Sequence, residues 1–240
     1  ITPQTHIVEG LGEMVKAVRG KCSLWSGTTV SGVSIDSRSL APSEAFIALR
    51  GLNRDGQLFV EAALSQDASC AIVEQDFKAP RGENRLIRVA DTLQALNDLG
   101  SASRARAKDT VVIAVTGSVG KTGTKEALKL VLSAQAPTHA SVGSYNNLWG
   151  VPLTLLQIEP DTEVAVVEMA MRGAGQIREL ARVALPDVGV ITNIAPVHLE
   201  LVGTIEDVAA AKAELVEELT DGTAVVPADD LMRSARAVKM

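Results

Sequence analysis

Aromatic side chains are scarce in this chain of 240 residues, which contains three Phe, two Trp and one Tyr. That scarcity argues against the aromatic platforms on which proteins stack single-stranded nucleic acid. Positive charge is not in excess either, since 23 Lys and Arg stand against 29 Asp and Glu and the formal net charge is -6. This sign is wrong for a general polyanion-binding surface. We therefore expect no nucleic-acid partner, and any bound phosphate must be held locally.

Cysteine and long apolar runs are also in short supply. Cys22 and Cys70 form no CxxC motif, which indicates two buried, reduced thiols rather than a zinc site or a disulfide framework. No apolar run approaches the roughly 18 residues of a membrane-spanning helix, and no leader pattern opens the sequence. We expect a monomeric, cytoplasmic protein without membrane insertion, whose core is built from Ala, Val, Leu and Ile.

The sequence pattern predicts an α/β protein with two domains. Up to Val89, short β-prone stretches alternate with turns and one helix, which is typical of a small α/β domain. From Val111, apolar runs separated by helical stretches predict a mostly parallel, buried sheet with crossover helices. We place the boundary near Lys108, giving domains of residues 1–107 and 108–240. The predicted strands are residues 30–36, 45–49, 70–75, 111–115, 163–169, 187–192 and 223–226, and the predicted helices are 59–68, 91–107, 122–134, 174–183 and 205–219.

The strongest local signal is the stretch TGSVGKT, which lies between an apolar strand and a predicted helix. Two glycines let backbone N–H groups close around a phosphate, Lys121 adds a positive charge, and Thr122 can offer its hydroxyl to Mg²⁺. The loop is shorter than the usual phosphate-loop pattern, because Val115 occupies the first glycine position. The alternative is a glycine-rich turn with a chance Lys-Thr pair. The candidate ATP-binding residues are Thr116, Gly117, Ser118, Gly120, Lys121 and Thr122.

Two further candidate ligands, Glu168 and His198, lie at or just past the carboxyl ends of predicted strands, where ligands bind in open α/β sheets, and a third candidate functional residue, Lys212, lies on a predicted helix. Glu168 closes one apolar run and would point at the phosphate loop if its strand lies beside the first; otherwise it marks the exit of the strand to solvent. His198 follows another strand, although a lone loop His is more often a surface residue. Lys212 falls on the apolar stripe of its helix, where it must snorkel, pair with an acid or be chemically altered.

Paired amides precede a Gly-Val-Pro turn and an apolar helix or strand. Asn146 and Asn147 can cap that element, which is the default for Asn at a helix start. They can also orient a carboxylate or phosphate of a substrate. Both roles stay open at this point.

Together these stretches resemble the Mur ligase family, the ATP-dependent enzymes that form amide bonds in peptidoglycan biosynthesis and so serve cell shape and division. Within the family the resemblance is to the member that joins D-Ala-D-Ala to UDP-N-acetylmuramoyl-tripeptide. It implies an acyl phosphate intermediate, with ATP and Mg²⁺ as cofactors, and a small UDP-sugar domain followed by a phosphate-loop ATPase domain. The stretches that carry it are TGSVGKTGTKE, NNLWGVPLTLL, VVEMAMRGAGQIREL, NIAPVHLELVGTIEDVAAAKAEL and, upstream, VSIDSRSLAPSEAFIALRGLNRDGQLF.

The resemblance also implies roles for single residues. Lys121 and Thr122 bind the outer phosphates and the first Mg²⁺, Glu168 ligates metal, and His198 looks like the ligand of the second Mg²⁺. Lys212 occupies the family's AKAE-type position, where the lysine is carbamylated and so becomes a metal-binding anion. Catalytic roles are thereby implied for Lys121, Lys212 and His198. Substrate-binding roles are implied for Asp36, Ser37, Arg38, Asn53 and Asp55, and substrate contacts are among the roles of Asn146 and Asn147.

Two departures from the family pattern qualify this expectation. Pro227 stands where the family has an Asn that contacts adenine. The chain also ends at Met240, whereas the family carries the rest of the ATPase sheet and a third domain, so we expect a fragment that is inactive by itself. The competing interpretations are another Mur ligase, folylpolyglutamate synthase, or a nucleotide-binding module without transfer chemistry.

Overall fold

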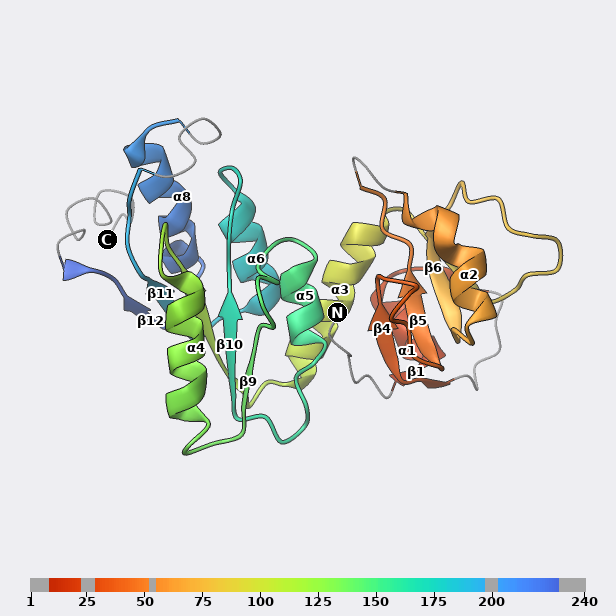
Figure 1. The fold of residues 1–240 in the computed structure, drawn as a ribbon, viewed down its shortest axis with the longest axis horizontal. Coiled ribbons are helices and arrows are strands. Elements are labelled where there is room, and N and C mark those ends of the chain that lie inside the picture. The colour runs from red at the N-terminus through yellow and green to blue at the C-terminus, as the bar shows by residue number, and fades with distance from the viewer. Residues whose placement is uncertain (1–8, 23–28, 52–54, 197–202, 229–240) are drawn as a thin grey trace. The chain divides into compact units, whose positions relative to one another are not determined.

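The structure divides the chain into two compact units. A computed structural model describes residues 9–22, 29–51, 55–196 and 203–228. The units are Ile1–Ser103 and Arg104–Met240, so the division falls inside helix α3 (Thr92–Arg106), shortly before the boundary expected near Lys108 (Figure 1). No helix among the described residues is long and apolar enough to cross a membrane.

The first unit is built on a five-stranded sheet in the order β2-β7-β6-β5-β4. All neighbouring strands are parallel except β2, which runs antiparallel to β7. A short antiparallel pair, β1 with β3, lies outside this sheet. The elements are β1 (Glu9–Gly10), α1 (Leu11–Ala17), β2 (Lys21–Cys22), β3 (Thr29–Val30), β4 (Gly32–Ser34), β5 (Glu44–Ile47), a 3₁₀ turn η1 (Gly56–Phe59), α2 (Val60–Ser65), β6 (Cys70–Glu74) and β7 (Leu86–Val89).

The predicted strands at residues 45–49 and 70–75 are confirmed, and residues 30–36 contain one whole short strand and the end of another. Strand β7 was not predicted, because its sequence Leu-Ile-Arg-Val is short and begins with two adjacent apolar residues, so it shows no regular alternation of apolar and polar residues. Cys70 is buried as expected, whereas Cys22 is only partly buried, and neither forms a disulfide. Burial raises the pKa of Cys70 to about 12, with a smaller contribution from the neighbouring Cys22.

The second unit is a five-stranded parallel sheet in the order β12-β11-β8-β10-β9. Its first strand in the chain, β8, lies in the middle. The chain therefore visits one side of β8 and then crosses to the other, which creates a topological switch point at the carboxyl ends. The elements are β8 (Val111–Thr116), α4 (Lys121–Leu132), β9 (Thr138–Ala140), α5 (Gly150–Leu155), β10 (Val164–Glu168), α6 (Gln176–Ala184), β11 (Val188–Ile191), α8 (Ile205–Glu217) and β12 (Thr223–Val225).

Helices pack on both faces of this sheet, which explains the continuous apolar runs of its strands. On one face, Leu128 and Leu132 of α4 pack against Val115 and Val166. On the other face, side chains from α5, α6 and α8 pack against Val112 and other strand residues. The predicted strands and helices of this unit are confirmed, and the expected fold class with them. Strand β9 was not predicted, because the short stretch THA has no apolar run.

A histidine of β9 makes this unit sensitive to acid. The His139 side chain is largely buried, and its Nε2 atom has no hydrogen-bond partner among the residues described. Burial lowers its pKa from 6.5 to about 4, and the positive charge of Lys129 lowers it further in the same direction. The folded protein therefore keeps this imidazole neutral over a pH range in which the unfolded chain protonates it.

We expect His139→Gln to flatten the acid dependence of stability. As pH falls from 6.5 towards 4, the unfolded chain binds a proton that the folded chain does not, so the free energy of unfolding decreases. Between pH 7 and pH 4.5 the wild type should lose about 2 kcal/mol more than the variant. Urea unfolding at both pH values measures this, and since carboxylates titrate equally in both proteins, equal losses would contradict the prediction.

Candidate functional site

The stretch TGSVGKT lies at the carboxyl end of the central strand β8. Thr116 ends this strand, Gly120 is the N-cap of α4, and Lys121 is the first helical residue. No side chain caps the first amides of α4. A helix N-terminus with free amides attracts anions, because the N–H groups and the helix dipole both favour negative charge.

Both glycines of the loop are required by its backbone. Gly117 has φ +147° and Gly120 has φ +88°, which are conformations that residues with a side chain rarely adopt. A Cβ atom on Gly117 would lie 1.9 Å from Oγ1 of Thr192, which is an impossible contact. The loop therefore passes too close to the end of β11 for any residue but glycine.

The loop is also fastened to the residues that follow β11. The backbone N–H of Ser118 donates to the carbonyl oxygen of Asn193 at 3.0 Å, and that of Val119 donates to Asn193 Oδ1 at 2.9 Å. The Ser118 hydroxyl donates to the Ala195 carbonyl at 3.0 Å and accepts from its N–H at 2.9 Å. Sequence reasoning did not identify Asn193 or Ala195, since neither carries a motif signal of its own.

Of two polar side chains of the loop, one has no hydrogen-bond partner among the described residues and the other is bonded to carbonyls of the loop itself. The Thr116 side chain is fully buried, and its Oγ1 atom has no hydrogen-bond partner among the described residues. The Lys121 ammonium group folds back over the loop and donates to the Gly117 carbonyl at 2.8 Å. Burial lowers the pKa of Lys121, and the nearby carboxylate of Glu168 opposes this shift. Such groups suit a ligand with phosphate oxygens.

Glu168 lies beside the loop because β10 pairs with β8 in parallel, with Glu168 opposite Val115. The sequence predicts that Glu168 points at the phosphate loop if its strand lies beside the first strand, and the two strands are indeed neighbours. Its carboxylate is almost fully buried, and Oε2 accepts from the Thr122 hydroxyl at 2.9 Å. Oε1 accepts from Asn146 Nδ2 at 2.7 Å. The alternative, a Glu that merely exits to solvent, is wrong.

The Thr122 and Glu168 oxygens form a donor set suited to Mg²⁺. This ion prefers hard oxygen ligands and binds through one or two carboxylates together with phosphates and water. No group of three or more His, Cys, Asp or Glu that could hold a metal is found among the described residues. A cation here would consequently take its remaining ligands from a phosphate group and from water.

Lys212 is buried on α8, with 4% of its surface exposed. The part of the chain that the structure describes offers its ammonium group no hydrogen bond or ion pair. Burial lowers its pKa to about 8, and the positive charge of Lys121 contributes in the same direction. Two lysines thus approach the same end of the sheet. His198, which the sequence indicates as a candidate together with Glu168 and Lys212, lies outside the described residues.

The paired amides have separate contacts. Asn147 Oδ1 accepts from the backbone N–H of Gly150 at 2.9 Å and from that of Trp149 at 3.2 Å, so this side chain caps the start of α5. Asn146 instead holds the Glu168 carboxylate, as described above. Asn147 therefore caps the helix, whereas Asn146 contacts the buried carboxylate.

The candidate substrate residues of the first unit lie at the carboxyl ends of its parallel strands. Asp36, Ser37 and Arg38 follow β4, and Asp55 lies in the connection after β5. The Arg38 guanidinium donates twice to the Asp36 carboxylate, and this pair lowers the pKa of Asp36 to about 2. Asp55 caps η1 by accepting from the backbone of the next turn. Asn53 lies outside the described residues.

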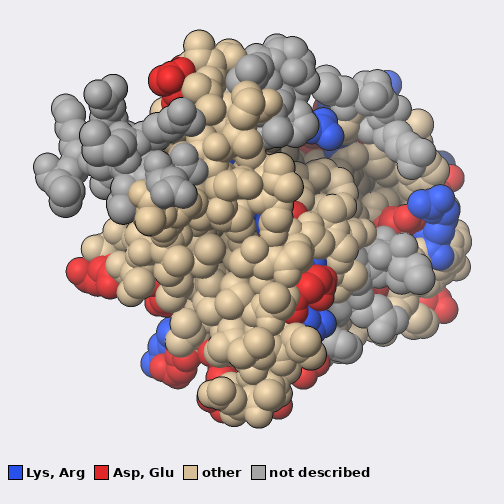
Figure 2. Space-filling model, turned by 60° about the vertical axis from the view of Figure 1, so that its left-hand side comes forward, with Lys and Arg blue, Asp and Glu red and all other residues tan. Residues whose placement is uncertain are grey.

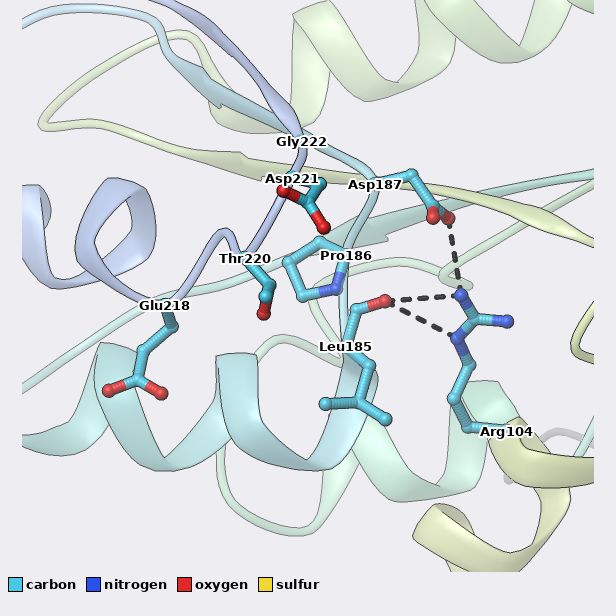
Figure 3. A pocket seen from close by; sticks show the side chains of 8 residues that line it. All are labelled: Arg104, Leu185, Pro186, Asp187, Glu218, Thr220, Asp221 and Gly222. Atoms are coloured by element: carbon cyan, nitrogen blue, oxygen red, sulfur yellow. Dashed lines mark hydrogen bonds and ion pairs between the residues drawn. The ribbon is translucent and has the colours of Figure 1, made fainter.

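A cavity of about 370 Å³ lies at the opposite end of the second unit, beside the beginnings of β11 and β12. Figure 3 shows Arg104 directed at the Leu185 carbonyl oxygen and the Asp187 carboxylate. The same guanidinium also donates to the carbonyls of Ala184 and Ala107. Its donors are occupied by the end of α6 and by neighbouring backbone, so this cavity is structural and not part of the phosphate loop.

Charge does not single out a phosphate site on the face drawn in Figure 2. On the face drawn in Figure 2, acidic and basic side chains lie in small groups among uncharged ones, without a broad basic patch in the described part. A phosphate ligand would accordingly be attracted by the local amides and lysines of the loop rather than by a field over a whole face.

Family models match both units of the chain. The Mur ligase middle domain matches residues 115–239, and a model described as Mur ligase family, catalytic domain, matches residues 29–104. The chain belongs to the Mur ligase family. Relatives named UDP-N-acetylmuramoyl-tripeptide–D-alanyl-D-alanine ligase are 38% identical over 75% of this chain in Bacillus subtilis and 41% identical over 65% in Synechocystis. The chain spans 39% and 34% of the lengths of these two relatives.

Solved Mur ligases share the fold. MurF from Acinetobacter baumannii aligns with a TM-score of 0.88 at 32% identity, over 96% of this chain and 52% of that chain. The MurF ligase from Thermotoga maritima, whose structure is a complex with ADP, aligns with a TM-score of 0.74 at 30% identity, over 84% of this chain and 47% of that one. A diaminopimelate-adding ligase aligns at 20% identity and a TM-score of 0.60, which shows the fold alone.

We expect Gly117→Ala to abolish nucleotide binding and to destabilise the second unit of this Mur ligase by more than about 1 kcal/mol, since it adds an atom where Thr192 lies and strains the backbone. Gly123→Ala is the matched control, because a Cβ there meets nothing within 4 Å. In the α4 helix this control should be stabilised by up to about 1 kcal/mol. Thermal unfolding with and without Mg·ADP tests both, and similar behaviour of the two variants would contradict the prediction.

Proposed function

We propose that the chain is part of an ATP-dependent ligase that joins D-Ala-D-Ala to UDP-N-acetylmuramoyl-tripeptide in the cytoplasm, a step of peptidoglycan biosynthesis that supports cell shape and division. The observation that carries this proposal is the hydrogen bond from Thr122 to the buried Glu168 carboxylate, beside a glycine-dependent phosphate loop in a Mur ligase chain. The names of its relatives supply the specific substrates. Because the chain spans less than two thirds of their lengths, it is proposed to supply the two binding units and to be inactive by itself.

The phosphate loop is proposed to hold ATP. Phosphate oxygens accept hydrogen bonds, and the uncapped amides at the start of α4 and the unpartnered Thr116 hydroxyl are donors for them. Lys121 would leave the loop carbonyls for the outer phosphates and neutralise the charge that develops on the transferred group. Thr122 and Glu168 would hold Mg²⁺, which when bound supplies positive charge to the same oxygens.

The proposed chemistry is the route that the resemblance to the family implies. A carboxylate oxygen of the tripeptide attacks the terminal phosphorus of ATP, the bond to ADP breaks, and an acyl phosphate forms. The amine of D-Ala-D-Ala then attacks the acyl carbon, an amide bond forms, phosphate leaves and the nitrogen loses a proton. The fixed loop, Lys121 and the buried Glu168 contribute position and electrostatic stabilisation, which are the main demands of phosphoryl transfer.

Lys212 is proposed to act as a carbamate and His198 as the ligand of a second Mg²⁺. The neutral Lys212 amine attacks the carbon of CO₂, an N–C bond forms, and the nitrogen proton passes to water. The product is an oxygen anion, which suits a hard cation and removes a buried positive charge close to Lys121. Burial without a carboxylate partner is the support for this role.

The first unit is proposed to hold the UDP end of the substrate at the carboxyl ends of β4 and β5. Asp36, Ser37 and Arg38 follow β4, Asp55 lies in the connection after β5, and parallel neighbours end at the same sheet edge. Asn53, which lies outside the described residues, is proposed with them on the resemblance alone. The Arg38 side chain is 79% exposed, so the guanidinium donors that Asp36 does not occupy are open to a diphosphate. Asn146 and Asn147 are proposed to contact the substrate only through the side-chain atoms that are not used in their hydrogen bonds to Glu168 and to the start of α5.

A crossed binding experiment tests the proposed function. Lys121→Ala should weaken Mg·ATP binding at least about tenfold and leave UDP-N-acetylmuramoyl-tripeptide binding intact, whereas Arg38→Ala should do the reverse, because each removes a charge-assisted contact to one ligand. Titration calorimetry on the chain measures both. The exposed Lys129→Ala and Arg81→Ala are the matched controls. Failure of the unaltered chain to bind either ligand would overturn the assignment.

Carbamylation of Lys212 has a direct spectroscopic test. With ¹³C-labelled bicarbonate, Mg²⁺ and nucleotide, ¹³C NMR of the chain should show a carbamate carbon that grows from pH 7 to pH 9, because the neutral amine is the reactive form and the pKa of Lys212 is about 8. Lys212→Met should lose this signal, and Lys129→Met should keep it. A signal that survives in Lys212→Met, or none at pH 9 in the unaltered chain, would contradict the role.

A further inference from the structure

Lys125 is a lysine with no exposed surface, which is unusual for a charged side chain. It lies on α4 one helical turn after Lys121, and no motif of the sequence drew attention to it. Its Nζ atom donates to the carbonyl oxygens of Ser141 at 2.8 Å and Gly143 at 3.0 Å, and it contacts Glu126 Oε1 at 2.9 Å. The three protons of the ammonium group thus have three partners.

The carbonyls that Lys125 holds belong to the segment of residues 141–147, which lies in the connection between β9 and α5. This segment contacts Glu168 twice. The Ser141 hydroxyl accepts from the Glu168 backbone N–H at 3.1 Å, and Asn146 Nδ2 donates to Glu168 Oε1 at 2.7 Å. The other carboxylate oxygen accepts from Thr122, which like Lys125 belongs to α4.

These contacts form a closed set. Helix α4 holds one oxygen of Glu168 directly, through Thr122. It holds the other oxygen indirectly, because Lys125 fastens the segment that presents Asn146. The carboxylate is therefore fixed from two sides by one helix, and this is the same helix whose N-terminus ends the phosphate loop.

An apolar residue would fill the space of Lys125 without the cost of burying a charge. It would not bind two carbonyls of an otherwise irregular segment. The side chain is thus suited to fixing the position of residues 141–147 rather than to packing. Partners that orient a metal-binding carboxylate typically change metal affinity tenfold to a hundredfold when they are removed.

We propose that Lys125 is a positioning residue that sets the geometry of the Mg²⁺-binding carboxylate by holding Asn146 against Glu168. The inference rests on the proposed function, in which Thr122 and Glu168 bind Mg²⁺ with the nucleotide. Lys125 itself touches neither. Its effect should appear in the Mg²⁺ dependence of nucleotide binding, and not in nucleotide binding as such.

The test is ADP binding to the chain by titration calorimetry, over a range of Mg²⁺ concentrations and in EDTA. Lys125→Met should raise the Mg²⁺ concentration needed for half of the Mg²⁺-dependent gain in affinity about tenfold. The affinity for ADP in EDTA should change less than about twofold. Lys125→Arg, which keeps donors for both carbonyls, should restore the Mg²⁺ dependence, and the exposed Lys129→Met on the same helix is the control.

A double variant separates positioning from general support of the fold. If Lys125 acts through Asn146, then Lys125→Met should add little to the loss already caused by Asn146→Ala. Fully additive losses, an unchanged Mg²⁺ dependence in Lys125→Met, or an equal loss in EDTA would each overturn the inference. If Lys125→Met fails to fold, Lys125→Gln replaces it, because Gln is too short to reach both carbonyls. Lys125→Gln should raise the Mg²⁺ concentration needed for half of the gain in ADP affinity about threefold. Wild-type behaviour of Lys125→Gln would overturn the inference.

Failure of the proposed function has a different signature. In that case the unaltered chain would bind ADP without any dependence on Mg²⁺, which removes the role of Glu168 and of Lys125 together. A normal Mg²⁺ dependence in the unaltered chain combined with an unaffected Lys125→Met variant removes the positioning role alone.

Discussion

Parallel pairing of β10 with β8 is the constraint on which the candidate site depends. It places Glu168 opposite Val115, one residue before the phosphate loop begins, and brings its carboxylate to the Thr122 hydroxyl. A shift of one residue would turn the Glu168 side chain to the other face of the sheet. The pairing is secured by apolar residues that face helices on both sides, so the hydrophobic core of this unit fixes the position of its chemistry.

Several charged side chains are buried at this end of the sheet, which is costly unless each has a use. Glu168 and Lys125 are fully satisfied by hydrogen bonds within the described part of the chain. Lys121 is bonded to carbonyls of the loop, Lys212 has no hydrogen bond to the described residues, and burial lowers the pKa of both. The structure thus combines a rigid, satisfied frame with two lysines whose charges are better matched by a bound anion or by modification.

The two units follow the same topological rule. In each, parallel strands end at a common edge, and polar residues follow those strands directly. In the second unit the loop is fastened by contacts with Asn193 and Ala195. In the first, the Arg38 side chain is largely exposed, whereas its partner Asp36 is partly buried. Preformed binding geometry is therefore stronger at the phosphate loop.

The sequence alone determined the fold class, the strands β8, β10, β11 and β12 of the second unit, the phosphate loop and the burial of Lys212, because these follow from apolar periodicity and from glycine and lysine at fixed local spacing. The tertiary structure alone decided the partners of Glu168, the separate contacts of Asn146 and Asn147, and the place of Lys125. Each of these joins residues far apart in the chain, and their proximity depends on the order of strands in the sheet. A local pattern carries no information about that order, which is why a fully buried lysine beside the loop could not be recognised before the sheet was assembled.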